Sequence, residues 1–140
     1  GKSWRGFFGG AFCGIVLGLI IIGISLLWDS SGTWGYGEFW GNVRVIVCLA
    51  FGAVLGDPCG AFIKRRLGME RGQKAPILDQ YDFVVGSMLL TLAVFPDFII
   101  NNYIEGWHIA ALIFVLLVTF FLHRGVNIIG YLMGVKKEPW

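Results

Sequence analysis

Charged side chains gather in one short part of this chain, residues 56–83, which read GDPCGAFIKRRLGMERGQKAPILDQYDF. Carboxylate oxygens are the ligands that Mg²⁺ prefers, while Lys and Arg neutralise the phosphate oxygens that a metal leaves free. The mixture of acidic and basic residues therefore predicts a site for a divalent cation and a polyphosphate. The aspartates are Asp57, Asp79 and Asp82, and the cations are Lys64, Arg65, Arg66, Arg71 and Lys74.

The spacing of two carboxylates favours a shared role. Asp79 and Asp82 are three residues apart and follow Pro76, which suits the first turn of a helix. On a helix both side chains would lie on one face, where they could share or bridge a metal. A structural alternative is that they only complement the helix dipole. Their position at the start of an apolar segment favours a function, because ionisable groups are costly where a helix enters lipid.

Asp57 and Lys64 are also placed to act together. They are seven residues apart, close to two helical turns, so on a continuous helix they would share a face with Gly60 and Ala61. The small residues between them predict a groove that opens to lipid. An internal ion pair that only holds helices together is an equal alternative at this point.

The composition sets the surroundings of this stretch. The chain has 140 residues, 56% hydrophobic and 14% charged, whereas soluble domains carry about 25% charged residues. We therefore expect an all-α integral membrane protein, a single membrane domain over residues 1–140 that forms a compact bundle of about four to five transmembrane helices. The net charge of +2 is too small to indicate a nucleic-acid partner.

Four apolar segments predict spans at about residues 7–28, 42–56, 83–100 and 107–122, with the charged stretch 57–82 between the second and the third. The tripeptide Gly56-Asp57-Pro58 predicts a break, at which Asp57 ends one helix and caps the next. Pro96 is expected to break the third segment near its end. The first segment carries Gly10, Gly14 and Gly18 at four-residue spacing, which predicts a face for close helix packing. A homodimer through this face is one way to use it.

The distribution of cations predicts the orientation. Four crossings place all but one of the 11 Lys and Arg residues on the same side, and only Arg44 lies near the other. By the positive-inside rule the crowded side is cytoplasmic. The protein is thus expected in the cell membrane as a multi-pass protein, with its charged stretch facing the cytoplasm. The other ten cations are Lys2, Arg5, Lys64, Arg65, Arg66, Arg71, Lys74, Arg124, Lys136 and Lys137.

Three blocks carry a resemblance to a known family. They are GKSWRG at residues 1–6, GDPCGAFIKRRLG at 56–68 and PILDQYDF at 76–83. The chain resembles the CDP-archaeol synthases, which are CTP:2,3-di-O-geranylgeranylglycerol-1-phosphate cytidylyltransferases, and is more distantly similar to bacterial phosphatidate cytidylyltransferases. Family members usually have one more span upstream of the first block. Ser3, Ala61 and Gln80 depart from the commoner pattern, and the departures favour the archaeal branch.

The resemblance implies transfer of CMP from CTP to the phosphate of an isoprenoid ether lipid, with release of pyrophosphate. This lipid would lie among the membrane lipids, and the reaction would belong to phospholipid biosynthesis. It implies Mg²⁺ held by Asp57, Asp79 and Asp82, and Lys64 and Arg65 match the Lys-Arg pair of the family. We expect Asp57, Lys64, Asp79 and Asp82 to be catalytic. Substrate binding is expected from Lys2, Arg5, Lys64, Arg65, Arg66 and Lys74.

Two rival functions make different predictions. A small transporter or ion channel needs ionisable residues through the depth of the bundle, whereas here they collect at one interface. A non-catalytic membrane subunit would use its glycine faces to bind partner helices, and its function would survive neutralisation of the aspartates.

Overall fold

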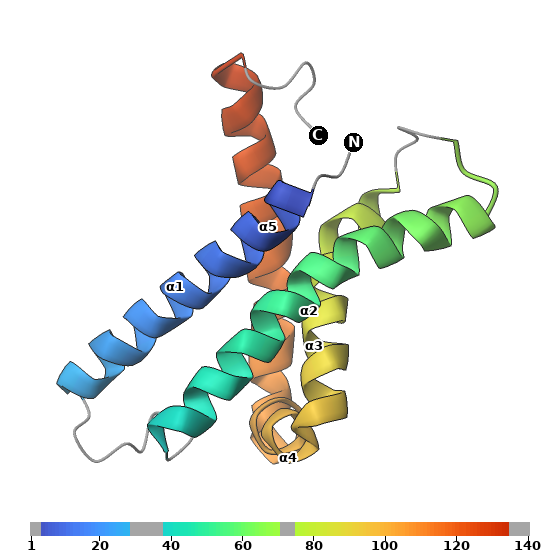
Figure 1. Ribbon diagram of the computed structural model, residues 1–140. Coiled ribbons are helices and arrows are strands. Elements are labelled where there is room, and N and C mark those ends of the chain that lie inside the picture. The colour runs from blue at the N-terminus through green and yellow to red at the C-terminus, as the bar shows by residue number, and fades with distance from the viewer. Residues whose placement is uncertain (1–3, 29–37, 71–74, 135–140) are drawn as a thin grey trace.

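The computed structural model of the protein describes residues 4–28, 38–70 and 75–134, all of which form helices or short connections between them (Figure 1). Four of the described helical segments are long and apolar enough to cross a membrane, namely 4–28, 39–66, 77–94 and 106–132. The prediction of an all-α multi-pass membrane protein is thereby confirmed. The elements are α1 (Trp4–Trp28), α2 (Phe39–Arg66), α3 (Pro76–Val94), α4 (Pro96–Ile99), the π-helix η1 (Ile100–Ile104), the 3₁₀-helix η2 (Gly106–His108) and α5 (Ile109–Leu132).

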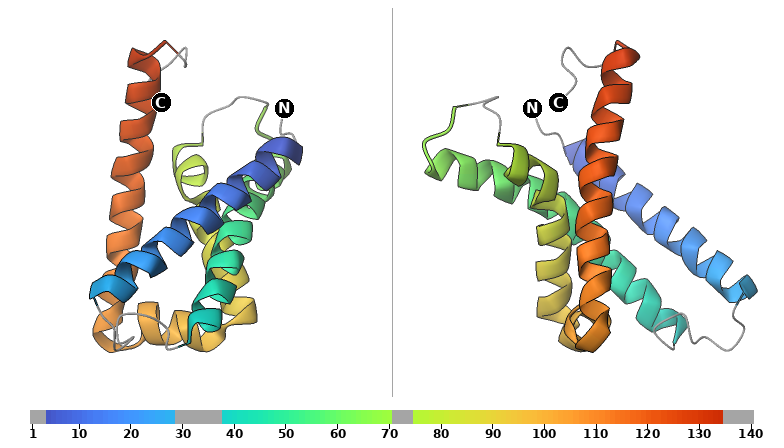
Figure 2. Two further views of the ribbon diagram at one scale, coloured as in Figure 1. Left: turned by 60° about the vertical axis from the view of Figure 1, so that its left-hand side comes forward. Right: turned by 180° about the vertical axis from the view of Figure 1, so that it is seen from behind.

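Helix α2 lies at the centre of the arrangement. It packs most extensively against α3 and also against α1, while α5 packs against α3. The start of α1, the end of α2, the start of α3 and the end of α5 lie at the same end of the bundle, shown at the top of Figures 1 and 2. We call this the charged end, because the described cations Arg5, Lys64, Arg65 and Arg66 belong to these helix termini and Arg124 lies in the second half of α5.

Glycines on α1 bring it close to α2. A methyl group added at Gly18 would lie 2.5 Å from Ile46 Cγ2, and one added at Gly14 would lie 3.1 Å from the Cβ of Ala50. Gly10 faces Val54 in the same way. The glycine face of the first span is thus used for close helix packing, as predicted. The partner that the structure shows is α2 of the same chain, which runs antiparallel to α1.

A second row of glycines, on α2, brings that helix against α3. A methyl group at Gly52 would lie 2.6 Å from the Cα of Ser87, and one at Gly56 would collide with the backbone carbonyl of Asp82. Gly86 on α3 makes the corresponding close contact from the other helix, since a methyl group there would collide with the carbonyl oxygen of Gly52. The two backbones are therefore in direct contact, which only residues without a side chain permit.

The predicted break at Gly56-Asp57-Pro58 is wrong. Helix α2 continues without interruption from Phe39 to Arg66 and contains Pro58. Proline inside a helix removes one backbone hydrogen bond and costs about 3 kcal/mol or more. The contact with α3 on both sides of Pro58, through Gly56 and Gly60, offsets this cost. Helix α2 visibly changes direction in its second half, as expected of a helix that contains proline (Figure 1).

Prolines mark the start and end of α3 as predicted, whereas the last helix is longer than predicted. Helix α3 begins at Pro76, so the predicted helix start at this residue is confirmed and both Asp79 and Asp82 belong to α3. Pro96 does break the third segment, because α3 ends at Val94 and α4 starts anew. The last helix continues to Leu132 through the stretch after residue 122.

At the end opposite the charged end, α4 and η1 run across the long helices (Figure 2). Phe98 and Ile99 are buried there against Val45 of α2. Tyr103 stacks edge-to-face on Phe98, at 6.0 Å between ring centroids, and its burial raises the pKa of its phenol. This apolar cluster packs α2 against α4 at the end of the bundle opposite the charged end.

Candidate functional site

An ion pair across the α2–α3 interface forms the centre of the charged end. The Lys64 ammonium group, in the last turn of α2, contacts Oδ1 of Asp79, in the first turn of α3. The Lys64 side chain is 20% exposed and that of Asp79 38% exposed. An ion pair this accessible contributes only about 0–1 kcal/mol to folding. Its significance is that a cation and a carboxylate from separate sequence blocks meet at one accessible point.

Helix geometry explains why Asp79 is held in place. Its other oxygen, Oδ2, accepts a hydrogen bond of 3.1 Å from the backbone N–H of Ala75, and its own N–H donates to the Ala75 carbonyl. A carboxylate in the first turn satisfies an N–H that has no partner within the helix and complements the helix dipole. Asp79 therefore has a structural role in addition to its contact with Lys64.

Asp82 lies one helical turn further along α3, on the side that faces α2. Its Oδ1 accepts a hydrogen bond of 2.8 Å from the N–H of Phe83. The space beside Gly60, for which the sequence predicts a lipid-facing groove, is occupied by this side chain, because a methyl group at Gly60 would lie 2.8 Å from Asp82 Oδ2. The prediction of a lipid-facing groove is therefore wrong at Gly60.

The remaining candidate residues lie around the ion pair of Lys64 and Asp79. Asp57 lies on α2 seven residues before Lys64, and its side chain is exposed. Arg65 and Arg66 are exposed in the last turn of α2, and the Arg66 guanidinium lies 5.5 Å from the ring centroid of Phe62. Lys64 and Arg66 thus point to different neighbours, Asp79 and Phe62, in agreement with the helical period. Arg5 is exposed near the start of α1. The candidates Lys2 and Lys74 lie outside the described residues.

The donor set fits Mg²⁺ in one particular way. Within residues 4–28, 38–70 and 75–134, no three acidic, His or Cys side chains form a metal-binding group. Mg²⁺ in nucleotide sites is commonly bound by one or two carboxylates together with phosphate oxygens and water. The half-buried Asp79 and Asp82 supply two hard oxygen donors of this kind on one helix. This arrangement of donors fits a metal that binds together with its nucleotide. It does not fit a preformed site of three carboxylates.

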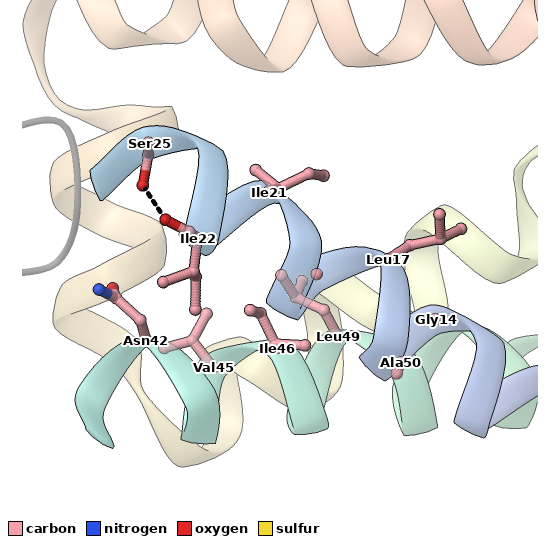
Figure 3. A pocket seen from close by; sticks show the side chains of 11 residues that line it. Gly14, Leu17, Ile21, Ile22, Ser25, Asn42, Val45, Ile46, Leu49 and Ala50 are labelled. Carbon is pink, nitrogen blue, oxygen red and sulfur yellow. Dashed lines mark hydrogen bonds between the residues drawn. The ribbon is translucent and has the colours of Figure 1, made fainter. Parts of the chain in front are cut away.

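A cavity of about 470 Å³ lies elsewhere, between α1 and α2 (Figure 3). Figure 3 shows Ile22 of α1 pointing toward Val45 of α2, with Ser25 and Asn42 at one end of the cavity. No charged side chain lines it. Phosphate chemistry needs compensating charge, so the charged end is the better candidate for the reaction.

Sequence reasoning includes Gly60 but not the whole glycine row of α2. Gly52, Gly56 and Gly60 recur every four residues, the same signal that identified the packing face of the first span. The predicted break around Pro58 would divide this row between two helices, so the sequence prediction contains no continuous glycine face here. The partner Gly86 carries no local signal of its own.

Comparison with known proteins covers the whole chain. The family model described as "CarS-like: CDP-archaeol synthase" matches residues 1–140. Curated proteins named CDP-archaeol synthase are similar over 100% of this chain. The one from Methanocorpusculum labreanum is 45% identical over 148 residues, covering 80% of its own length. Those from Methanosarcina barkeri and Picrophilus torridus are each 40% identical, over 80% and 74% of their lengths. No solved structure matches.

Proposed function

This chain belongs to the CDP-archaeol synthase family, and we propose that the charged end of its bundle is where it transfers CMP from CTP to a lipid phosphate. The protein makes CDP-archaeol for archaeal lipid biosynthesis and is a cytidylyltransferase. CTP and an isoprenoid glycerol phosphate are the substrates that this activity implies. We propose which residues bind the substrates, that Mg²⁺ is the metal, and that the charged end faces the cytoplasm.

The observation that carries the proposal is the contact of Lys64 with Asp79. It joins the block at residues 56–68 to the block at residues 76–83, the two parts of the sequence with the chemistry that a metal-bound triphosphate needs. The contact is partly exposed at a bundle end that also carries Arg65 and Arg66. A ligand rich in phosphate oxygens can therefore reach it.

The reaction places few chemical demands on the protein. An oxygen of the lipid phosphate forms a new bond to the α-phosphorus of CTP, and the bond from that phosphorus to the bridging oxygen of pyrophosphate breaks. The second pKa of a phosphomonoester is about 6, so near neutral pH the attacking group is already largely ionised and needs no general base. The chain must instead hold two anions together in the correct geometry.

We assign these roles to the candidate residues named above. Lys64, once it exchanges Asp79 for phosphate, and Arg65 bind the triphosphate and the departing pyrophosphate, because donors held at developing negative charge lower the barrier. Asp82 and Asp79 would hold Mg²⁺, with Asp57 as a further candidate ligand. When bound, the metal neutralises phosphate oxygens and orients them for in-line displacement. Arg5, Arg66, Lys2 and Lys74 are assigned to the lipid phosphate and the cytidine.

The membrane position suits this assignment. The lipid keeps its chains in the bilayer while its phosphate reaches the charged end, which we place in the cytoplasm by the positive-inside rule. The transporter alternative is not favoured, because among the described residues no Asp, Glu, Lys, Arg or His is buried within the bundle. A pathway for ions would need such groups at depth.

Direct assay tests the proposal. Purified protein in detergent micelles receives Mg²⁺, CTP labelled in its cytosine ring, and a lipid phosphate with either isoprenoid ether or acyl chains. We expect label in the organic phase with the isoprenoid lipid, at least 100-fold less with Asp82→Asn, and normal transfer with Asp97→Asn, which neutralises an exposed carboxylate at the opposite end. Equal transfer by the two variants would contradict the proposed site.

A further inference from the structure

We propose that Gly60 is a positioning residue for the reaction, because the side chain it lacks leaves the space in which the Asp82 carboxylate rests. The inference depends on the proposed role of Asp82 in holding the metal and its nucleotide. It adds a residue with no chemistry of its own to the set that the reaction requires.

The contact between the two residues is close and specific. A methyl group at position 60 would lie 2.8 Å from both Cβ and Oδ2 of Asp82 and 3.3 Å from its Cγ. Gly60 is buried and Asp82 is half-buried. Oδ1 of the same carboxylate is occupied by the N–H of Phe83. One oxygen is thus held by the backbone of α3 while the other lies over Gly60 of α2, and together these contacts fix the direction of the carboxylate.

Gly60 differs from the other glycines of its row. At Gly52 and Gly56, the atoms nearest to an added methyl group belong to the backbone of α3. At Gly60, all three nearest atoms belong to the Asp82 side chain. The first two glycines therefore affect only the distance between the helices. Gly60 affects that distance through Cβ of Asp82 and, in addition, the position of the carboxylate through Cγ and Oδ2.

Substitution of Gly60 has a predictable consequence. An alanine methyl group requires Asp82 to move. A change of rotamer takes Cγ and Oδ2 away from the methyl group, whereas Cβ, which would lie 2.8 Å from it, moves only with a small local shift of the α3 backbone. A misplacement of about 1 Å in a catalytic arrangement can cost about 100-fold in rate. We expect Gly60→Ala to fold, to bind Mn²⁺ in the presence of CTP about tenfold more weakly, and to lose 10- to 100-fold in kcat, as these magnitudes imply.

The matched control is Gly52→Ala, which adds the same methyl group to the same face of α2, two turns away. Electron paramagnetic resonance would measure Mn²⁺ binding to each detergent-purified variant with saturating CTP, and thermal melting would measure stability. We expect Gly52→Ala to lower the melting temperature while the folded fraction keeps normal Mn²⁺ affinity. Equal Mn²⁺ affinity for Gly60→Ala and the unsubstituted protein would overturn the proposal.

A double-mutant cycle shows whether Gly60 acts through Asp82. In an Asp82→Asn background, Gly60→Ala should change Mn²⁺ affinity by less than about twofold, because its effect is already lost. Full additivity would overturn the proposal. If Gly60→Ala alone does not fold, the combination of Gly60→Ala with Asp82→Gly should restore folding, since it removes the colliding side chain, and failure to restore it would count against the proposal equally.

The proposed function fails in a different way. The unsubstituted protein would then bind no Mn²⁺ with CTP, or Asp82→Asn would retain full transfer. An active protein whose transfer depends on Asp82 but is insensitive to the residue at position 60 contradicts only the role of Gly60.

Discussion

Lys64 and Asp79 are fifteen residues apart in the sequence and form an ion pair between the last turn of α2 and the first turn of α3. Neither helix alone brings these charges together. The pair holds an ammonium group where a phosphate is expected and a carboxylate where a metal is expected. In the proposed reaction, binding of the metal and nucleotide exchanges this internal pair for two external ones.

The first prediction concerns the charge of Lys64. Replacement by methionine, which keeps much of the length of the side chain, should lower kcat/KM for CTP about 100- to 1000-fold because a donor to developing phosphate charge is lost. Steady-state assay of lipid transfer measures this effect. Arg44→Met, at the opposite end of α2, is the matched control and should transfer CMP normally. A Lys64→Met variant with normal kcat/KM would contradict the assignment of this residue to the triphosphate.

A second prediction concerns the order of metal and nucleotide binding. Because Asp79 is already paired with Lys64 and no described group of three ligands exists, Mg²⁺ alone should bind only weakly, whereas CTP supplies the missing oxygens. Titration calorimetry should detect saturable Mg²⁺ binding at sub-millimolar concentrations only with CTP present. Chelation of Mg²⁺ with EDTA should abolish transfer, and added Mg²⁺ should restore it. Tight Mg²⁺ binding without CTP would indicate a preformed cage instead.

A third prediction tests the contact between α1 and α2. Gly18→Leu places a side chain where even a methyl group would lie 2.5 Å from Ile46, and overpacking of this kind costs about 1–3 kcal/mol. Gly23→Leu makes the same change on the same helix, where nothing lies within 4 Å of an added methyl group. Thermal melting in detergent should show a lower melting temperature for Gly18→Leu alone. Equal melting temperatures would argue that α1 is not held against α2 through this face.

The fourth prediction concerns Tyr81, which lies between the two aspartates of α3. Its hydroxyl donates a hydrogen bond of 3.3 Å to the backbone carbonyl of Leu116 on α5. Tyr81→Phe should therefore destabilise the fold by about 0.5–1.5 kcal/mol while keeping most of the transfer activity. Tyr131→Phe, at an exposed position of α5, is the control. A loss of activity without a loss of stability would instead place Tyr81 among the residues that contact substrate.

The amino-acid sequence by itself determined the features that depend on local composition. Long apolar runs specified membrane helices, because a bilayer accepts only segments whose backbone groups are paired internally. Proline chemistry specified that α3 begins at Pro76 and ends shortly before Pro96, at Val94. The side of the bundle that carries the cations was also evident from residue type and spacing, and the roles proposed for the aspartates and the lysine rest on the same signals.

Only the tertiary structure decided how these parts meet. Gly56 and Pro58 suggest a break when considered alone, yet α2 continues through them because contact with α3 stabilises the helical form. The role proposed for Gly60 cannot be inferred from the residues next to it in the sequence, since the side chain that fills its space belongs to Asp82 on another helix. Local patterns specify which face of a helix is small or charged. Which helix covers that face depends on packing between segments distant in the sequence, and that packing brings together the residues of the proposed site.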